Sequence, residues 1–304
     1  MKITIVGTGR VGSAIAFACV MNPIAKELLL INRTPDKAEG DALDLLHASA
    51  LRNTNMQIRS GDIEESEESD VIVFTASIPY GGATLKTRTE LAADNYKLLG
   101  EWLPGLAKAS PNAILIIVTN PVDMLTYAAI KLSGFPPERV IGTGTLLDSV
   151  RYRAMLSEKL QIHSDDIRAY ILGEHGDTQF AAKSVAMTGG ERFFSDDVTE
   201  QIFQRTVGMG YKVAQLKGFT NYGVAMATVM ILDSIAYDLR HTMPLSVLVD
   251  GFCGVNDVCL SLPTVIGREG VTRILHPPLS DDEQQLFLAS ADAVRQTIRQ
   301  VGLT

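Results

Sequence analysis

Short apolar runs alternate with segments of helical periodicity along the first half of the chain. Such runs predict buried β-strands, here at residues 3–6, 28–31, 56–60, 71–74, 114–118 and 139–141. Between the first two runs, Val11, Ile15 and Cys19 recur at the spacing of one helix face. Strands that are apolar on both faces and alternate with helices predict a doubly wound, parallel α/β sheet.

The alternation ends near residue 143, and the second half has a different pattern. We predict strands at 168–172, 246–250 and 255–262, a long apolar helix at 223–239, and a C-terminal helix at 281–301 with Ser280 as its N-cap. This is an α+β pattern. We therefore expect two domains, residues 1–143 and 144–304, which pack closely because the chain has no repeat or long linker.

Composition narrows the classes of function. The net charge is −8 and the basic residues are scattered, which disfavours binding to nucleic acid. No apolar run has the length of a membrane span or a signal peptide, and the three cysteines show no metal-ligand spacing. We expect a cytoplasmic protein with no metal site, no membrane contact and no disulfides. The acidic run from Asp62 to Asp70 is expected to be a solvated loop.

The clearest chemical motif is the sequence GTGRVG, which follows the first predicted strand and opens a helix. In a G-x-G-x-x-G loop, Gly7 permits the tight turn, Gly9 lets a pyrophosphate approach the backbone, and Gly12 lets the helix pack on the strand. Free N–H groups at the helix start then face the anion. In this context a dinucleotide-binding (Rossmann) domain is favoured over a glycine-rich turn without a ligand.

The end of the second strand bears on which dinucleotide is bound. An Asp or Glu is expected there to bind the ribose hydroxyls of NAD. The chain has Asn32, Arg33 and Thr34 instead. The neutral amide would not repel a 2′-phosphate, and Arg33 with Thr34 can bind one through charge-assisted hydrogen bonds. This favours NADP. The alternative is that Arg33 points to solvent and the site still takes NAD.

Two clusters carry possible catalytic groups: GEHGD at 173–177 and LDSVR at 147–151. A single histidine between glycines is more often structural than catalytic. A histidine that has an aspartate to orient it and an arginine to bind a carboxylate is suited to acid–base chemistry. The sequence does not show whether these residues meet in space.

At this point the chain resembles the L-lactate/malate dehydrogenase family along nearly its whole length. The resemblance rests on GTGRVG, KAEGDALDLLHA at 37–48, NPVD at 120–123, VIGTGTLLDSVRYR at 140–153, GEHGDTQF at 173–180 and KGFTNYG at 217–223. It implies a dinucleotide-binding domain followed by a substrate domain, a 2-hydroxy or 2-oxo acid as the substrate, and a homodimer or homotetramer.

The resemblance also implies roles for individual residues. His175 would exchange the proton with the 2-hydroxyl group, and Asp148 would orient its ring. Arg151 would hold the substrate carboxylate, and Arg88 would polarise the carbonyl from a mobile loop that closes over the substrate. Asn120 would bind near the reacting oxygen or the nicotinamide, and its bond to Pro121 is a candidate cis peptide. The cofactor contacts implied are Gly7, Gly9, Arg10, Val11, Gly12, Asn32, Arg33, Thr34, Thr75, Ala76 and Asn120.

The substrate loop argues for a monocarboxylic acid. Malate dehydrogenases of this family usually carry a second arginine before the position of Arg88, but residues 78–87 contain none, and Lys86 is their only cation. Tyr80 and Gly82 are both possible specificity positions. Thr220 falls where lactate-type members tend to have threonine. We therefore expect pyruvate or an acid with a larger apolar side chain, with malate as the alternative substrate.

Two further alternatives belong to other classes. One is the related nicotinamide-dependent glycosidases, which need metal ligands and a longer chain. The other is a non-catalytic dinucleotide sensor. The set of Arg88, Asp148, Arg151 and His175 disfavours the sensor.

Overall fold

The structure, a computed structural model, describes residues 1–52, 55–78, 87–192 and 197–303. Within these ranges, the first half contains six parallel strands. They are β1 (Lys2–Val6), β2 (Glu27–Ile31), β3 (Gln57–Ser60), β4 (Val71–Phe74), β5 (Ile114–Ile117) and β6 (Val140–Gly142). Their order across the sheet is β3-β2-β1-β4-β5-β6. This order confirms the predicted doubly wound fold, in which ligands bind beyond the carboxyl ends of the strands.

The same sheet continues into the second half of the chain. Strands β12 (His241–Asp250), β13 (Asn256–Gly267) and β14 (Gly270–Ile274) extend it in antiparallel fashion beyond β6. The predicted α+β character is confirmed by this extension and by the short strands β7 to β11. They are Ile167–Arg168, Ile171–Leu172, Phe180–Ala181, Met187–Thr188 and Glu191–Arg192. The single strand predicted at 168–172 is therefore wrong in detail, because β7 and β8 pair with different partners.

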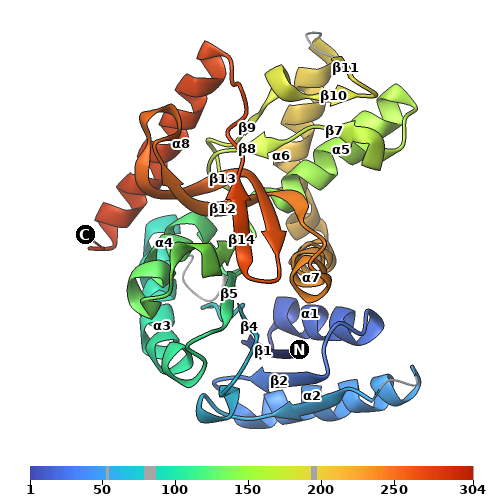
Figure 1. Ribbon diagram of the computed structural model, residues 1–304, viewed down its shortest axis with the longest axis vertical. Helices are drawn as coiled ribbons and strands as arrows, with labels where there is room; N and C mark the ends of the chain where they lie inside the picture. The colour runs from blue at the N-terminus through green and yellow to red at the C-terminus, as the bar shows by residue number, and fades with distance from the viewer. Residues whose placement is uncertain (53–54, 79–86, 193–196, 304) are drawn as a thin grey trace.

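Helices cover both faces of the large sheet (Figure 1). On one side lie α1 (Arg10–Met21), α2 (Pro35–Ala50) and α7 (Tyr222–Tyr237). On the other lie α3 (Arg88–Ala109), α4 (Val122–Ser133) and α8 (Asp281–Gln300). Helices α5 (Leu146–Leu160) and α6 (Asp197–Lys217) pack against each other beside the short strands. The apolar pattern does not predict α6, whose sequence is largely polar and contains Gly208 and Gly210.

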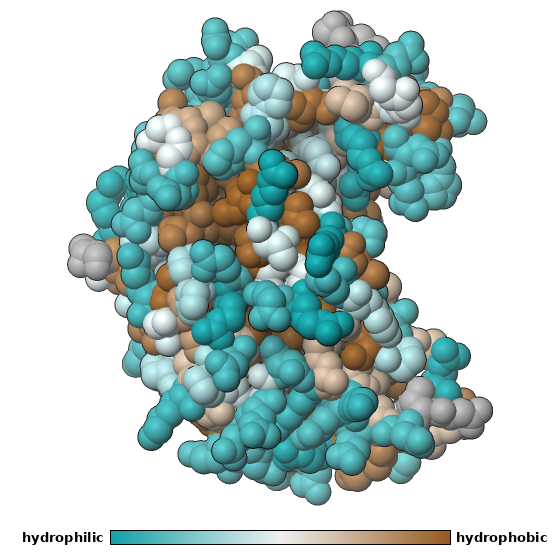
Figure 2. Space-filling view, in the orientation of Figure 1, coloured by the Kyte–Doolittle hydropathy of each residue, from teal (hydrophilic) through white to brown (hydrophobic). Residues whose placement is uncertain are grey.

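The strands of the parallel sheet could be predicted from the sequence because nearly all of their residues are buried and apolar. Every residue of β4 and β5, and all but the first residue of β1 and β2, is buried. Figure 2 shows apolar surface gathered in the middle of one face, with mostly hydrophilic surface over α2 and β2 below it. None of the helices in the described part of the chain combines the length and apolar character needed to cross a bilayer.

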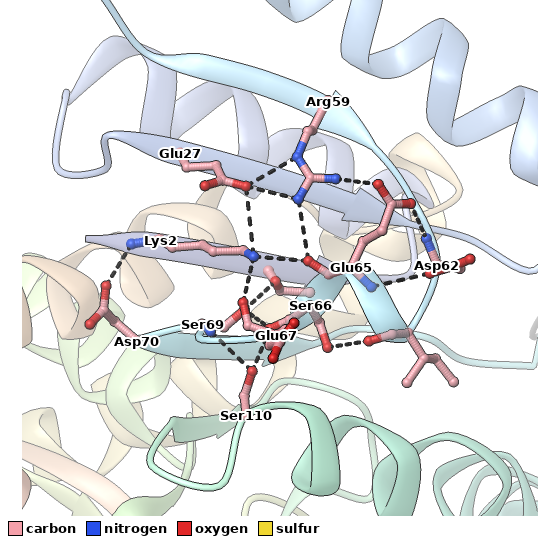
Figure 3. A network of polar contacts seen from close by, with 12 residues as sticks. Lys2, Glu27, Arg59, Asp62, Glu65, Ser66, Glu67, Ser69, Asp70 and Ser110 are labelled. Atoms are coloured by element: carbon pink, nitrogen blue, oxygen red, sulfur yellow. Dashed lines mark hydrogen bonds and ion pairs between the residues drawn. The ribbon is translucent and has the colours of Figure 1, made fainter.

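Charged side chains form a closed network at the amino end of the parallel strands (Figure 3). The Lys2 Nζ donates to the carbonyl oxygens of Glu65 (2.8 Å) and Glu67 (2.6 Å). The Arg59 guanidinium binds Glu27 (3.1 Å) and Glu65 (2.6 Å). The acidic residues of the run 62–70 are exposed, as predicted. The run also binds two cations of the sheet, Lys2 through carbonyl oxygens and Arg59 through the Glu65 carboxylate.

Candidate active site

The phosphate loop joins β1 to α1, and its three glycines meet different surroundings. A Cβ at Gly12 would lie 1.9 Å from the Gly7 carbonyl oxygen, and one at Gly7 would lie 2.6 Å from the backbone of Ala76. A Cβ at Gly9 would meet nothing within 4 Å. Gly7 and Gly12 are thus required by packing, whereas Gly9 leaves open space in front of the start of α1. That open space fits the pyrophosphate of a dinucleotide.

Thr75 and Ala76 support this loop from the end of β4. The Thr75 hydroxyl donates to the carbonyl oxygen of Gly7 at 2.6 Å. Ala76 packs directly against Gly7, which has a φ of +97° that favours glycine. The loop is therefore shaped by the neighbouring strand. Arg10, in the same loop, places its guanidinium 4.2 Å from the ring centroid of Phe219, one residue before Thr220.

Asn32 is held by both ends of its amide. Its Nδ2 donates to the Thr8 hydroxyl at 2.7 Å, and its Oδ1 accepts from the Thr34 backbone N–H at 3.0 Å. The side chain thereby links the phosphate loop to the start of α2. Arg33 and Thr34 are exposed beside it.

Two segments far apart in the sequence bring the catalytic candidates together. Gly173 pairs with Ser261 of β13 through two backbone hydrogen bonds, which fixes the start of the 173–177 segment. Helix α5 presents Asp148 and Arg151 toward that segment. The His175 Nδ1 lies 2.7 Å from the Asp148 Oδ2, and the Arg151 Nη1 donates to the Asp148 Oδ1 at 3.3 Å. The structure thus places the 147–151 and 173–177 clusters in contact, which the sequence alone could not show.

Burial and charge set the protonation of this pair. The Asp148 side chain is 5% exposed and the His175 side chain 31%, so the imidazole is the member that ligands can reach. Burial raises the pKa of Asp148, but the charge and hydrogen bond of His175, together with Arg151, outweigh burial and hold that pKa below its usual value. Burial lowers the pKa of His175, and the Asp148 carboxylate outweighs it, so that the pKa is raised.

Asn120 follows β5 and precedes α4. Its peptide bond to Pro121 is cis, as predicted from the resemblance. The Asn120 Oδ1 accepts from the Val122 backbone N–H at 3.2 Å, and the buried Asn95 side chain donates to the Asn120 carbonyl at 2.8 Å. These contacts hold the exposed amide of Asn120 at the carboxyl end of the sheet.

The sequence reasoning missed Asp123, although it lies within the quoted NPVD motif. This carboxylate is buried at the start of α4. It accepts the His175 backbone N–H at 2.7 Å and the Ser246 hydroxyl at 2.6 Å. Burial raises its pKa to about 6, against the lowering effect of these two hydrogen bonds. The signal available in the sequence was an acidic residue in the first turn of a helix beside the sheet edge.

A cavity of about 450 Å³ connects these groups. His175, Arg151, Asn120 and Thr220 all line it. The rest of its wall is mainly apolar or small and includes Val11, Leu91, Leu147, Val207, Gly210, Ala214 and Val224. Its size and mixed lining suit a small organic acid next to the reactive end of a cofactor.

Some predicted positions lie outside the described residues. They include Tyr80, Gly81, Gly82 and Lys86 of the predicted substrate loop. The predicted closure of this loop over the substrate therefore also falls outside the described residues. The backbone of Arg88 begins α3, but its side chain is not among those described. Within the described ranges, no group of three or more His, Cys, Asp or Glu side chains is arranged to hold a metal ion.

Comparison with known proteins gives a consistent result along the whole chain. Residues 1–142 match the family profile described as lactate/malate dehydrogenase, NAD binding domain, and residues 145–302 match its alpha/beta C-terminal domain. An L-lactate dehydrogenase of Clostridium perfringens is 36% identical over 304 aligned residues, which cover 97% of this chain and 95% of that protein. The L-lactate dehydrogenase 1 of Clostridium acetobutylicum is 38% identical, with 98% and 97% covered.

Two solved structures are similar over almost their full length. The crystal structure of MGS-M5, a lactate dehydrogenase from a deep-sea metagenome library of the Medee basin, has a TM-score of 0.95 at 33% identity. It covers 99% of this chain and 98% of its own. The minor L-lactate dehydrogenase of Enterococcus mundtii has a TM-score of 0.94 at 31% identity, with the same coverage.

Proposed function

Because the chain belongs to the lactate/malate dehydrogenase family, we propose that it interconverts a 2-oxo monocarboxylic acid and its L-2-hydroxy acid with a nicotinamide dinucleotide. The observation that carries this proposal is the His175–Asp148 pair, 2.7 Å apart, in one cavity with Arg151. An acid–base group and a fixed cation are what a 2-oxo acid needs for reduction.

Each residue then has one task. The Arg151 guanidinium binds the substrate carboxylate as a planar fork. The protonated His175 donates its Nε2 proton to the carbonyl oxygen as the hydroxyl forms, and the neutral ring takes the proton back in the reverse reaction. Asp148 keeps the Nδ1 proton in place and stabilises the imidazolium. When bound, the nicotinamide supplies the hydride to the carbonyl carbon or accepts it.

A monocarboxylic substrate is supported by the cavity wall. In its described part, Arg151 is the one arginine, and Thr220 and several apolar groups complete the lining. A second substrate carboxylate buried there without a cation would be unfavourable. We propose pyruvate and lactate as the reference pair, as the names of the relatives suggest. Oxaloacetate is the less favoured alternative.

The test is initial-rate kinetics of NADH and NADPH oxidation with pyruvate, a branched-chain 2-oxo acid, phenylpyruvate and oxaloacetate. We expect kcat/KM to be highest for one of the monocarboxylic acids. A higher value for oxaloacetate would contradict the substrate assignment. Cofactor binding without turnover of any of these acids would favour the non-catalytic sensor.

The family profile names an NAD-binding domain, and nothing in the relatives supports a preference for NADP. The NADP preference expected from Asn32, Arg33 and Thr34 therefore rests on charge alone. We propose to decide it by fluorescence titration with NADH and NADPH, using Asn32→Asp and Arg33→Ala. If Arg33 binds a 2′-phosphate, both substitutions weaken NADPH binding more than NADH binding. If the two substitutions changed NADH and NADPH binding equally, the argument for NADP would fail, and NAD would be the expected cofactor.

We also propose that the protein is a homodimer or homotetramer. Helices α1 and α7 pack against each other, and both expose large apolar side chains: Phe17, Met21, Tyr222 and Met226. Light scattering after size-exclusion chromatography would measure the mass. A monomer at micromolar concentration would contradict this proposal.

A further inference from the structure

Phe219 lies between the phosphate loop and the wall of the cavity, and two cations contact its ring. The Arg10 guanidinium lies 4.2 Å from the ring centroid, and the Lys217 Nζ lies 4.6 Å from it. The residue after Phe219, Thr220, lines the cavity, and so does Val11, the residue after Arg10. The ring therefore joins the start of α1 to the connector between α6 and α7.

Backbone geometry brings Phe219 to the phosphate loop. Helix α6 ends at Gly218, whose φ of +87° favours glycine and whose N–H donates to the Ala214 carbonyl oxygen at 2.7 Å. Helix α7 then begins at Tyr222 and packs against α1, beside which it lies in Figure 1. The short connector at 218–221 is thus held at both ends next to the start of α1.

The two cations have no acidic partner in the part of the chain that the structure describes. Lys217 instead donates to the Asn221 Oδ1 at 2.6 Å and lies 3.7 Å from the ring centroid of Tyr222. The first turn of α1 contains no acidic residue, and its N-cap, Gly9, forms no side-chain hydrogen bond. An anion at this point would offset two like charges and bind the free N–H groups of the helix start.

The kind of contact decides what Arg10 can still bind. A carboxylate would occupy two of the guanidinium N–H donors, whereas the face of an aromatic ring attracts the cation and occupies none of them. Arg10 is exposed, so without the ring its side chain would sample several rotamers and lose entropy on binding a ligand. The contact with Phe219 therefore places the guanidinium while leaving its donors available for phosphate oxygens.

We propose that Phe219 is a positioning residue for the cofactor: its ring holds the Arg10 guanidinium at the phosphate loop, ready to bind the diphosphate of the dinucleotide. Lys217, which the rings of Phe219 and Tyr222 hold, supplies a second positive charge for the second negative charge of the diphosphate. The inference rests on the proposed function, because it concerns how the cofactor of that reaction is bound. Phe219 acts through Arg10 and does not itself line the cavity.

Fluorescence titration with NADH tests this proposal through a double-substitution cycle. Phe219→Leu keeps an apolar side chain but removes the aromatic face, so NADH should bind roughly two- to fivefold more weakly. Arg10→Met should weaken NADH binding roughly ten- to hundredfold. In the Arg10→Met background, Phe219→Leu should then have no further effect. The same loss in both backgrounds would overturn the proposal, because Phe219 would then act without Arg10.

Two matched variants check that the aromatic face near Arg10 is the cause. Phe219→Tyr retains the ring and should bind NADH as the wild type does. Tyr222→Leu removes a ring from Lys217 alone, so its effect should be smaller than that of Phe219→Leu. Equal losses in the two leucine variants would contradict the assignment to Arg10. If Phe219→Leu does not fold, Phe219→Met takes its place in the cycle.

Competition with fragments of the cofactor identifies the part that Phe219 affects. ADP-ribose contains the diphosphate and should lose affinity for Phe219→Leu by the same factor as NADH. Adenosine contains no phosphate and should bind this variant and the wild type equally. In kinetics, the KM for NADH should rise while kcat does not fall. Weaker binding of adenosine by the same factor would show a general disturbance of the site and refute the role in positioning.

Failure of the proposed function would give a different result. If the wild type binds NADH but reduces none of the 2-oxo acids, the catalytic proposal fails, and the substitution cycle still decides the role of Phe219. If the wild type binds neither NADH nor ADP-ribose, the role of Phe219 in positioning a diphosphate ligand is refuted as well.

Discussion

The two ends of the parallel sheet use charged side chains in opposite ways. At the amino end, Lys2 and Arg59 are bound by carboxylates and carbonyls of neighbouring segments (Figure 3). At the carboxyl end, the imidazole of His175 and the guanidinium of Arg151 line a cavity and keep donors that protein groups do not fully occupy. The first arrangement links neighbouring segments of the fold, whereas the second leaves two groups facing the cavity in which we propose that the substrate binds.

Charged groups at the two ends differ in their surroundings rather than in the lengths of their ion pairs. Both ends contain ion pairs of similar length, so distance alone does not distinguish them. What differs is whether a partly exposed group faces a cavity while its partner is buried, as His175 does beside Asp148. Substitutions at the two ends should therefore have different consequences.

The largest expected effect is that of His175→Asn. Loss of the proton donor should reduce kcat by roughly 10³-fold or more, while the unfolding temperature and NADH binding stay near wild type. His47→Asn is the matched control, since His47 is exposed on α2 and should keep full activity. Loss of NADH binding in His175→Asn would show instead that the residue is structural.

Asp148→Asn should have the next largest effect, about 10²-fold on kcat, because the ring loses the group that orients it. The pKa of His175 is raised in the folded protein, so reduction weakens as pH rises through that pKa. In the variant this decline should move to lower pH. An unchanged pH profile would contradict the assigned contact.

Stability should follow pH in the same variant. The lowered pKa of Asp148 adds stability above its ordinary value of 3.8, and this is lost as pH falls. The raised pKa of His175 adds stability below its ordinary value of 6.5, and this is lost as pH rises through the raised pKa. The unfolding temperature of Asp148→Asn should differ most from wild type between these two values. Calorimetry across pH would measure it.

Gly9→Ala tests the open part of the phosphate loop. A Cβ there has free space, so the unfolding temperature should hold, but it would obstruct the pyrophosphate. Loss of one backbone hydrogen bond to a charged group, about 1.5–3 kcal/mol, weakens NADH binding roughly ten- to hundredfold. Gly12→Ala is the contrast, because its Cβ collides with Gly7 and should destabilise the fold as well. Unchanged NADH affinity in Gly9→Ala would place the cofactor elsewhere.

The smallest effect belongs to the amino end. Glu27→Gln removes the charge that Lys2 and Arg59 share at 3.7 and 3.0 Å. These groups are partly exposed, so the free energy of unfolding should fall by only about 0.5–1 kcal/mol, and less in high salt. We expect kcat/KM to be unchanged. A clear loss of activity would mean that the two ends of the sheet are coupled.

Much of the fold was predictable because its strands carry local signals. Val71–Phe74 and Ile114–Ile117 are apolar on both faces, which only a covered parallel sheet explains. The capping box of Ser280 and Glu283 likewise marks the start of α8. The polar helix α6 has no comparable signal, and its position depends on packing against α5.

The site was predictable only in its parts. The sequence motifs predicted His175, Asp148 and Arg151 as site residues. The contact between His175 and the other two depends on the pairing of Gly173 with Ser261, nearly ninety positions later in the chain. Asp123 was missed for the same reason. Its partners, His175 and Ser246, lie on segments that no local pattern connects to α4.

The junction between β6 and β12 has a consequence for protein engineering. One sheet runs through both halves, and Ser246, which binds Asp123, is also the residue of β12 that pairs with Gly142 of β6. A fragment ending near residue 143 would leave β6 as a bare edge strand, which tends to pair with other chains and aggregate. A chimera that combines the two halves of different relatives would need residues at the β6–β12 junction that fit each other. Only then could its substrate preference be compared with that of its parents.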